Sequence, residues 1–265
     1  MYRDLSPFKC FGEAWQFLLY RPGLAYGATI LYLLIMTVGG FIPFFSLIAG
    51  PPMIAGFVLL SLNLAGRREA NLEDLFQGFR EFGRSLGAYF LLTLGCLAAC
   101  LPTVIGVFYL VFSVARDTEP NLPAVFGVVG LTLLNLLVVY FFSLRWIFVL
   151  HVVMDEPDLD VMDCFRRSYY ITRGNQWNLV GMTVIMFVAL MGLYMFLGMM
   201  FVIADPFLLV GTFVFLAAFW PAAMAFAMIA VSRAYLWLKG FHPRPVPAMP
   251  PAPTQPLPTS APIPQ

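Results

Sequence analysis

The chain has 265 residues, of which 61% are hydrophobic and only 11% are charged, whereas soluble domains carry about 25% charged residues. A soluble fold of this size could not cover so much apolar surface, which excludes a soluble globular protein. The formal net charge of +1 gives no reason to expect a nucleic-acid partner. We therefore predict an all-α, polytopic membrane protein.

Four stretches, uncharged apart from Asp205, are long enough to cross a membrane. A spanning helix needs about 20 apolar residues, so the first and last stretches hold two spans each and the middle ones hold one each. The stretches are Gly23–Gly66, Gly87–Ala115, Pro120–Leu144 and Gly174–Ser232. They predict six transmembrane helices within a membrane domain of residues 1–240. The first outer turn stays open between Pro43 and the pair Pro51-Pro52.

The cationic residues lie on one side of these predicted spans. Of the 15 Lys and Arg residues, all except Arg116 precede the first span, follow the sixth, or lie between spans two and three or four and five. The positive-inside rule then places both termini in the cytoplasm of a bacterium, with the protein in the inner membrane. The remaining outer loops are short, which excludes an outer ligand-binding domain.

Each predicted pair of spans follows a short segment with helical spacing of its apolar residues. The segments begin with an N-cap residue, Ser6, Asn71 or Asp160, and each has a Phe five residues later. Pro7 suits the first helical position after its cap. The apolar faces hold Phe8, Phe11, Trp15 and Leu18, then Leu72, Leu75, Phe76 and Phe79, then Val161, Cys164, Phe165 and Ser168.

We interpret these segments as cytoplasmic interfacial helices, so that the chain has three units of one amphipathic helix plus a transmembrane hairpin. The shared spacing favours a diverged internal repeat. The alternative is that any loop rejoining a membrane becomes amphipathic. The candidate lipid-facing or interface residues are Trp15, Phe76, Arg80, Arg84, Phe165, Arg166 and Arg167. Whether they contact lipid or fold back over the bundle stays open.

Two of these segments carry a family resemblance. Gly66-Arg67-Arg68-Glu69 with Leu72 to Phe79, and Phe165 to Trp177, resemble recurrent signatures of uncharacterised bacterial membrane proteins. These proteins are similar to the membrane domain sometimes fused to glycerophosphodiester phosphodiesterases, and the resemblance covers about residues 1–240. It implies no phosphodiesterase activity, because only His151 and His242 are available and no metal-binding carboxylate cluster accompanies them.

Arg145 and His151 are the candidate functional residues within the membrane. A charge in the membrane is costly and often functional, and the alternative for Arg145 is that it snorkels to the cytoplasmic edge. His151 lies four residues before Asp155 and could share a helix face with it, but the pair lacks the ligand number of a metal site. We interpret the acidic residues from Asp155 to Asp163 as a solvated helix start.

Soft side chains recur at helical spacing in two of the predicted spans. Cys96 and Cys100 lie one turn apart, and Met191, Met195 and Met199 form a stripe. Thiolates and thioethers suit Cu(I), but helix packing explains such residues better. We therefore predict no metal site and no cofactor.

Residues 241–265 contain ten of the 21 prolines and are predicted to form a disordered cytoplasmic tail. Its PxxP spacings could bind a protein partner. Because no catalytic constellation is visible, we predict a non-enzymatic, membrane-organising or accessory protein. Its partners would be membrane lipids and a protein bound through the tail or the cytoplasmic helices. The alternative function is transport of a small molecule or lipid.

Overall fold

The computed structural model describes residues 6–116, 122–203 and 206–240, and these residues form helices and turns with no strand. The predicted tail, residues 241–265, lies outside the described residues. The helices are α1 (Pro7–Tyr20), α2 (Pro22–Gly39), α3 (Phe45–Ala65), α4 (Asp74–Gln77), α5 (Phe82–Arg116), α6 (Leu122–Trp146), α7 (Val149–Asp155), α8 (Val161–Thr172), α9 (Gln176–Ile203) and α10 (Pro206–Lys239).

The long helices occupy the stretches that the sequence marks as uncharged. The turn between α2 and α3 contains Pro43, and Phe44 takes a left-handed conformation with φ of 63° just before α3 begins. Pro51 and Pro52 lie inside α3 and do not break it. Of the two positions that the sequence left open for this turn, the structure has the one at Pro43.

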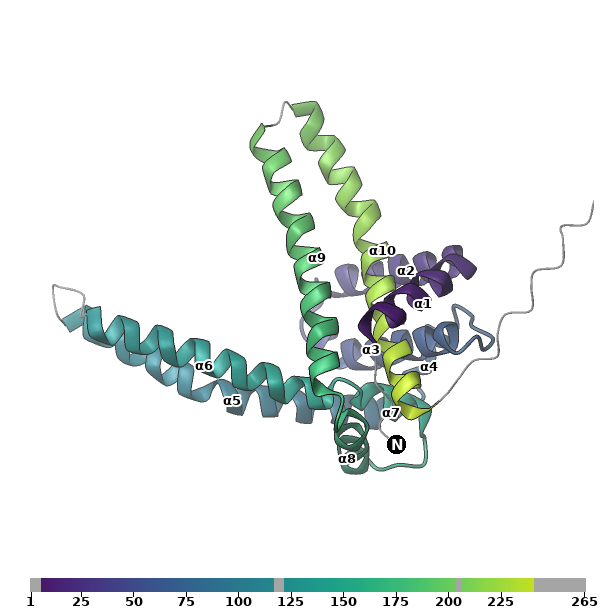
Figure 1. Ribbon diagram of the computed structural model, residues 1–265, viewed down its shortest axis with the longest axis horizontal. Coiled ribbons are helices and arrows are strands. Elements are labelled where there is room, and N and C mark those ends of the chain that lie inside the picture. Colours follow the sequence, from purple (N-terminus) through teal and green to yellow (C-terminus); the bar gives the residue numbers. More distant parts are fainter. Residues whose placement is uncertain (1–5, 117–121, 204–205, 241–265) are drawn as a thin grey trace, which may run out of the picture.

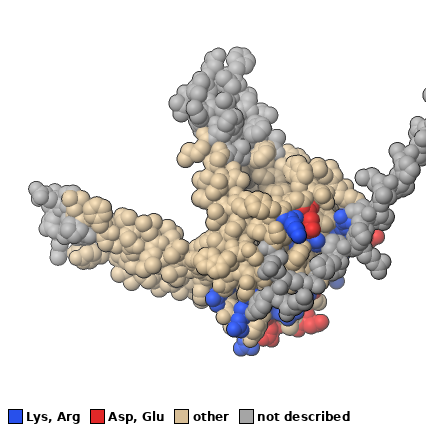
Figure 2. All heavy atoms as spheres, viewed as in Figure 1, with Lys and Arg blue, Asp and Glu red and all other residues tan. Residues whose placement is uncertain are grey.

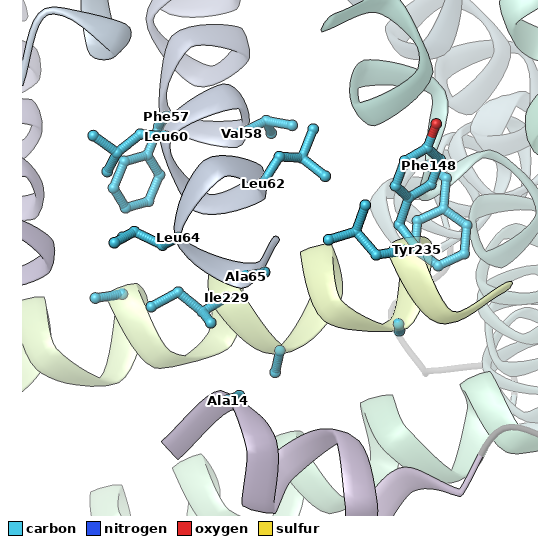
Figure 3. Packing of buried hydrophobic residues seen from close by; sticks show 14 of the residues in the cluster. Ala14, Phe57, Val58, Leu60, Leu62, Leu64, Ala65, Phe148, Ile229 and Tyr235 are labelled. Atoms are coloured by element: carbon cyan, nitrogen blue, oxygen red, sulfur yellow. The ribbon is translucent and has the colours of Figure 1, made fainter. Parts of the chain in front are cut away.

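Short helices and parts of long ones form a packed region that we call the hub: α1, α3, α4, α7, α8 and residues 225–240 of α10. Figure 3 shows α10 between α3 on one side and Ala14 of α1 on the other. Phe57 and Leu60 of α3 and Tyr235 of α10 are buried in its core. Tyr32 of α2 stacks on Phe57 with ring centroids 5.3 Å apart, which holds α2 against the hub.

Two glycines let α3 and the segment around α4 approach each other closely. A Cβ atom on Gly56 would lie 1.8 Å from the carbonyl oxygen of Leu75, and one on Gly78 would lie 1.9 Å from that of Pro52. The predicted amphipathic helix that follows Asn71 and carries Leu72 to Phe79 on one face is therefore wrong as a continuous helix. The chain forms only the four-residue α4 and then turns, because residues 75–78 follow the surface of α3.

The other two amphipathic helices begin where the sequence predicts. Ser6 and Asp160 are the N-cap residues and Pro7 opens α1, but neither cap side chain makes a hydrogen bond. Cys164, Phe165 and Ser168, which belong to the predicted apolar face of α8, are buried against the protein.

The face of α1 that packs against the protein is not the apolar face that the sequence marks for the membrane interface. The face consists of Cys10, Ala14 and Phe17, whereas Phe8 and Trp15 are exposed. The small side chains of Cys10 and Ala14 allow α1 to lie close to α10, and Phe11 and Trp15 add ring contacts with Phe226 of α10, at centroid distances of 5.9 and 6.2 Å.

Residues 90–116 and 122–143 of α5 and α6 form a region that we call the arm. Figure 1 shows this pair extending to the left of the hub, away from α9 and α10. No residue of the arm whose exposure is described is buried. Asn135 of α6 donates a hydrogen bond to the carbonyl of Ala99 of α5 at 2.6 Å, which is an interhelical bond of the kind predicted for the polar residues of the spans.

By length and composition, five helices of the described chain could cross a membrane. A sixth is added if α8 and the first part of α9, which meet at a bend of 92°, are counted as one broken span. Gly174, with φ of 91°, lies in that bend. The described chain is therefore all-helical and consistent with a multi-pass membrane protein.

Candidate functional site

Asp155, the last residue of α7, is the centre of a charged cluster. Its carboxylate accepts hydrogen bonds from the Tyr235 hydroxyl at 3.0 Å and the Lys239 Nζ at 2.6 Å, and Arg68 lies 3.5 Å from its other oxygen. The Asp155 side chain is only 8% exposed. The interpretation of this residue as part of a solvated helix start is therefore wrong, because donors from α10 and the segment after α3 replace its water.

Glu156 extends the cluster toward α5 and α8. Its carboxylate lies 2.6 Å from Lys239 Nζ and 3.5 Å from Arg167 Nε. Its carbonyl accepts a hydrogen bond from Arg84 Nη2 at 2.9 Å, and Arg84 also pairs with Glu81. Arg84 and Arg167, which the sequence marks as interface candidates, thus join α5 and α8 to the end of α7.

The remaining interface candidates divide between surface and core. Trp15, Phe76, Arg80 and Arg166 are exposed, and the only ion pair of Arg166 among the described residues is with its neighbour Asp163 on the same helix. Phe165 is buried and packs edge-on against Trp146, with ring centroids 5.5 Å apart. Phe165 therefore contacts the bundle, and the other four side chains are available to lipid, solvent or a partner.

His151 is 3% exposed and sits inside the hub. Its Nε2 lies 3.2 Å from Ser232 Oγ, which lies 2.6 Å from Ser61 Oγ. Ser61 donates to the carbonyl of Val58, so all contacts are satisfied if Nε2–H donates to Ser232 and Ser232 donates to Ser61. His151 Nδ1 is buried without a hydrogen-bond partner among the described residues.

His151 and Asp155 share one face of α7, as their spacing predicts, but no hydrogen bond joins them. Both contact Tyr235 of α10, His151 through its ring and Asp155 through the hydroxyl. The sequence analysis missed Ser232, Tyr235 and Lys239. Their spacing of three and four residues puts them on one helical face, a polar face that matches the one on α7.

Arg233 is a cation that the sequence analysis assigned to the segment after the last span. The structure has it inside α10, buried, with its Nε paired to Glu13 of α1. Its guanidinium lies 5.4 Å from the centroid of the Phe17 ring. Arg233 is therefore not a loop charge, because α10 continues as a helix to Lys239.

Arg145 lies in the last turn of α6, at the edge of a groove of about 480 Å³. With the Gln176 amide oriented so that its oxygen faces the guanidinium, that oxygen accepts from Arg145 Nε at 3.0 Å and Nη2 at 3.3 Å. The guanidinium also stacks 4.8 Å from the centroid of the Tyr169 ring. The groove is lined by Leu137, Val138, Phe141, Phe142, Arg145, Trp146 and Tyr169.

The four cysteines are free thiols, and two of them are buried in the hub. Burial raises the pKa of the Cys10 thiol to about 11, so this residue stays protonated near neutral pH. No group of three or more His, Cys, Asp or Glu residues in the described part of the chain could hold a metal ion.

Residues 17–242 match a family model described as a domain of unknown function, DUF7847. The chain belongs to the DUF7847 family. The DUF7847 region begins within α1 and includes the Asp155 cluster, the Arg145 groove and the arm. No curated protein and no solved structure matches the chain significantly.

Proposed function

We propose that this DUF7847 protein is a non-enzymatic, multi-pass protein of the bacterial inner membrane. In this proposal it has six spans arranged as three hairpins, both termini in the cytoplasm, and the task of organising partner proteins in the membrane. One observation carries the membrane placement. Among the candidate spans of the described residues, the two most apolar 18-residue windows lie within Phe82–Tyr109 and Val125–Asp155 and contain no buried residue, whereas 67% of the less apolar window in α3 is buried.

This relation between hydropathy and burial is the reverse of that in a water-soluble protein. In water, the most apolar segments would be the ones removed from solvent by the fold. A chain that leaves them uncovered needs another apolar medium, and lipid is that medium. Residues Leu133, Leu134 and Phe108 are examples of arm side chains that are mostly exposed.

The distribution of charge supports the proposed orientation. Figure 2 shows charged side chains gathered over the hub, with uncharged side chains along the visible parts of the arm. The ion pairs of Asp155, Glu156 and Arg84 belong to this charged end. Placing it in the cytoplasm satisfies the preference of Lys and Arg for that side. The order of a short helix followed by two long ones, found at α1, α4 and α8, agrees with the proposed three units.

A non-catalytic role is favoured because the one buried Ser–His contact has no room for a substrate. The pocket beside Ser61 measures about 10 Å³, far below the roughly 300 Å³ of a small-molecule site. Ser232 and His151 lie within the packed hub. The charged groups nearby, Asp155, Glu156 and Lys239, pair with one another.

The arm is the surface that we propose for a partner, which would be another membrane protein with apolar helices. A photoreactive amino acid at Leu133, introduced in living cells, tests this proposal. We expect a cross-linked product of one defined mass that contains a second membrane protein. The same probe at Phe187 on α9 serves as a control for random collisions. Products with lipid alone, or a ladder equal to that from Phe187, would contradict the proposed partner.

The groove beside Arg145 favours a second function, transport of a lipid. Its volume and its cation suit a lipid headgroup, which a purely structural surface does not require. The test is the rate at which a fluorescent phospholipid crosses the bilayer of vesicles containing the purified protein. The accessory role predicts a rate equal to that of empty vesicles. A faster rate that falls in Arg145→Leu but not in Arg166→Leu would favour transport instead.

A further inference from the structure

We propose that the groove beside Arg145 is a binding site for one anionic glycerophospholipid, whose phosphate lies on the guanidinium and whose acyl chain follows α6 toward the arm. This inference rests on the membrane placement proposed above and not on the accessory role. The site is formed by the last three turns of α6 and by Tyr169 of α8, next to the start of α9.

The Arg145 guanidinium is held in place before any ligand arrives. With the Gln176 amide oriented as above, its oxygen accepts hydrogen bonds from Nε and Nη2 of Arg145. The Tyr169 ring stacks against the guanidinium. The carbonyl of Arg145 also accepts from Ser168 Oγ at 2.9 Å, which fixes the end of α6 on α8. A guanidinium whose position is fixed loses less conformational entropy when it binds a phosphate.

Arg145 has no carboxylate partner among the described residues, and its Nη1 has no hydrogen bond there. In this it differs from Arg84 and Arg167, which each pair with a glutamate. A cation at the end of a membrane helix is costly unless an anion or water reaches it. A phosphodiester is the anion present at that depth, and guanidinium groups bind phosphate oxygens through paired hydrogen bonds.

The rest of the groove suits an acyl chain and not a second polar group. Leu137, Val138 and Phe141 continue along α6 from the cation. From Arg145 back to Leu137 is eight residues, or about 12 Å of helix at about 1.5 Å per residue. The volume of about 480 Å³ lies within the range of about 300–1,000 Å³ that is typical of small-molecule sites.

Aromatic residues beside Arg145 indicate that this part of the molecule lies at the membrane interface. Trp177 is exposed, and its ring meets that of Phe141 edge-on with centroids 6.1 Å apart. Trp and Tyr gather at the level of lipid headgroups. Tyr169 and Trp177 flank Arg145 on α8 and α9, which puts the guanidinium at the depth of the phosphates.

The experiment uses the full chain, purified from membranes in an uncharged detergent. Phosphatidylglycerol is added in steps, and the number of bound lipids is counted by native mass spectrometry. We expect one lipid to bind more tightly than all others. Its affinity should fall at least tenfold in Arg145→Leu and stay within twofold of the original in Arg166→Leu. Uncharged diacylglycerol and inorganic phosphate are added in parallel, and neither is expected to compete with phosphatidylglycerol.

Two results would overturn the site: equal binding by Arg145→Leu, or full competition by diacylglycerol. Competition by inorganic phosphate alone would overturn the lipid as occupant. If Arg145→Leu does not fold, the variant Leu137→Trp is used instead, because its larger side chain fills the groove. Loss of lipid binding in that variant supports the site, and unchanged binding overturns it. Recovery of the chain from the soluble fraction would instead refute the membrane placement, so the two failures are distinguishable.

Discussion

α3 in the hub and the two helices of the arm are all apolar enough to cross a membrane, yet α3 buries most of its side chains against protein and the arm does not. In α3, Phe57, Leu60 and Leu62 are almost fully covered. On the arm, large side chains such as Phe108, Leu133 and Leu134 remain at least 60% exposed. Composition alone therefore does not say which apolar helix belongs to a protein core and which needs lipid.

Glycine shows the same difference between the two regions. Gly56 and Gly78 in the hub meet backbone carbonyls at distances that no Cβ atom could occupy. Gly127 and Gly130 on the arm have no atom within 4 Å of such a Cβ. The hub uses the missing side chain to bring backbones together, whereas the tightest such contact on the arm, at Gly106, is with the side chain of Leu131 at 3.2 Å.

Gly56→Ala should have the largest effect on stability. The added methyl group would meet the carbonyl of Leu75 at 1.8 Å, and neither backbone can move without separating α3 from α4. We expect a loss of about 3 kcal/mol, at the upper end of overpacking effects. Thermal unfolding of the detergent-solubilised protein, followed by Trp fluorescence, measures it.

The control is Gly127→Ala on the arm. Alanine favours a helix over glycine by about 1 kcal/mol, and the site has open space. Its melting temperature should stay unchanged or rise slightly. If both variants lost the same stability, the distinction between hub and arm would fail.

Asp155→Ala should have an intermediate effect. It removes the acceptor of Tyr235 and Lys239 and leaves these groups partly buried. Breaking a fully buried pair costs about 3–5 kcal/mol, and we expect about 2 kcal/mol here because Lys239 keeps Glu156 and some contact with solvent.

Asp163→Ala is the matched control for that variant. It removes one exposed partner of Arg166 on α8, and surface pairs contribute about 0–1 kcal/mol. Urea unfolding of both variants gives the comparison. An equal loss in both would mean that the Asp155 cluster contributes no more than a surface pair.

Asn135→Leu tests the smallest effect, within the arm. The variant loses the hydrogen bond to Ala99, and interhelical bonds in membrane proteins contribute about 0.6 kcal/mol on average. We expect the free energy of unfolding to fall by that amount. The control is Thr132→Val, whose hydroxyl donates to the carbonyl of Val128 in its own helix, and its free energy of unfolding should change by less than half as much. A loss above 2 kcal/mol would show that the arm depends on this contact as the hub depends on its core.

The sequence predicted the long helices because their length and lack of charge are local properties. Ser6 and Asp160 also marked helix starts correctly, since capping depends on neighbouring residues. The break near Gly78 could not be predicted in this way, because it depends on contacts with Pro52 and Gly56 of α3, which lie more than 20 residues earlier in the chain.

The candidate site was predicted less well, for the same reason. Arg145 and His151 were recognised as candidates and Asp155 was assigned to a solvated helix start, because the partners of these residues come from distant segments. Ser232 and Lys239 are ordinary residues of a helix end until α10 packs on α7. From the sequence alone, Arg233 resembles a cation of the loop after the last span. In the structure it is buried and pairs with Glu13 of α1.

The most direct test of the central claim, that lipid covers the arm, uses thiols already in the chain. Cys96 and Cys100 on the arm are only partly covered by protein, whereas the Arg166→Cys variant places a thiol on an exposed side chain of α8. Inside-out membrane vesicles are treated with a charged maleimide. We predict rapid labelling at position 166 and none at Cys96 or Cys100 until the protein is denatured. Labelling of Cys96 as fast as position 166 would contradict the account.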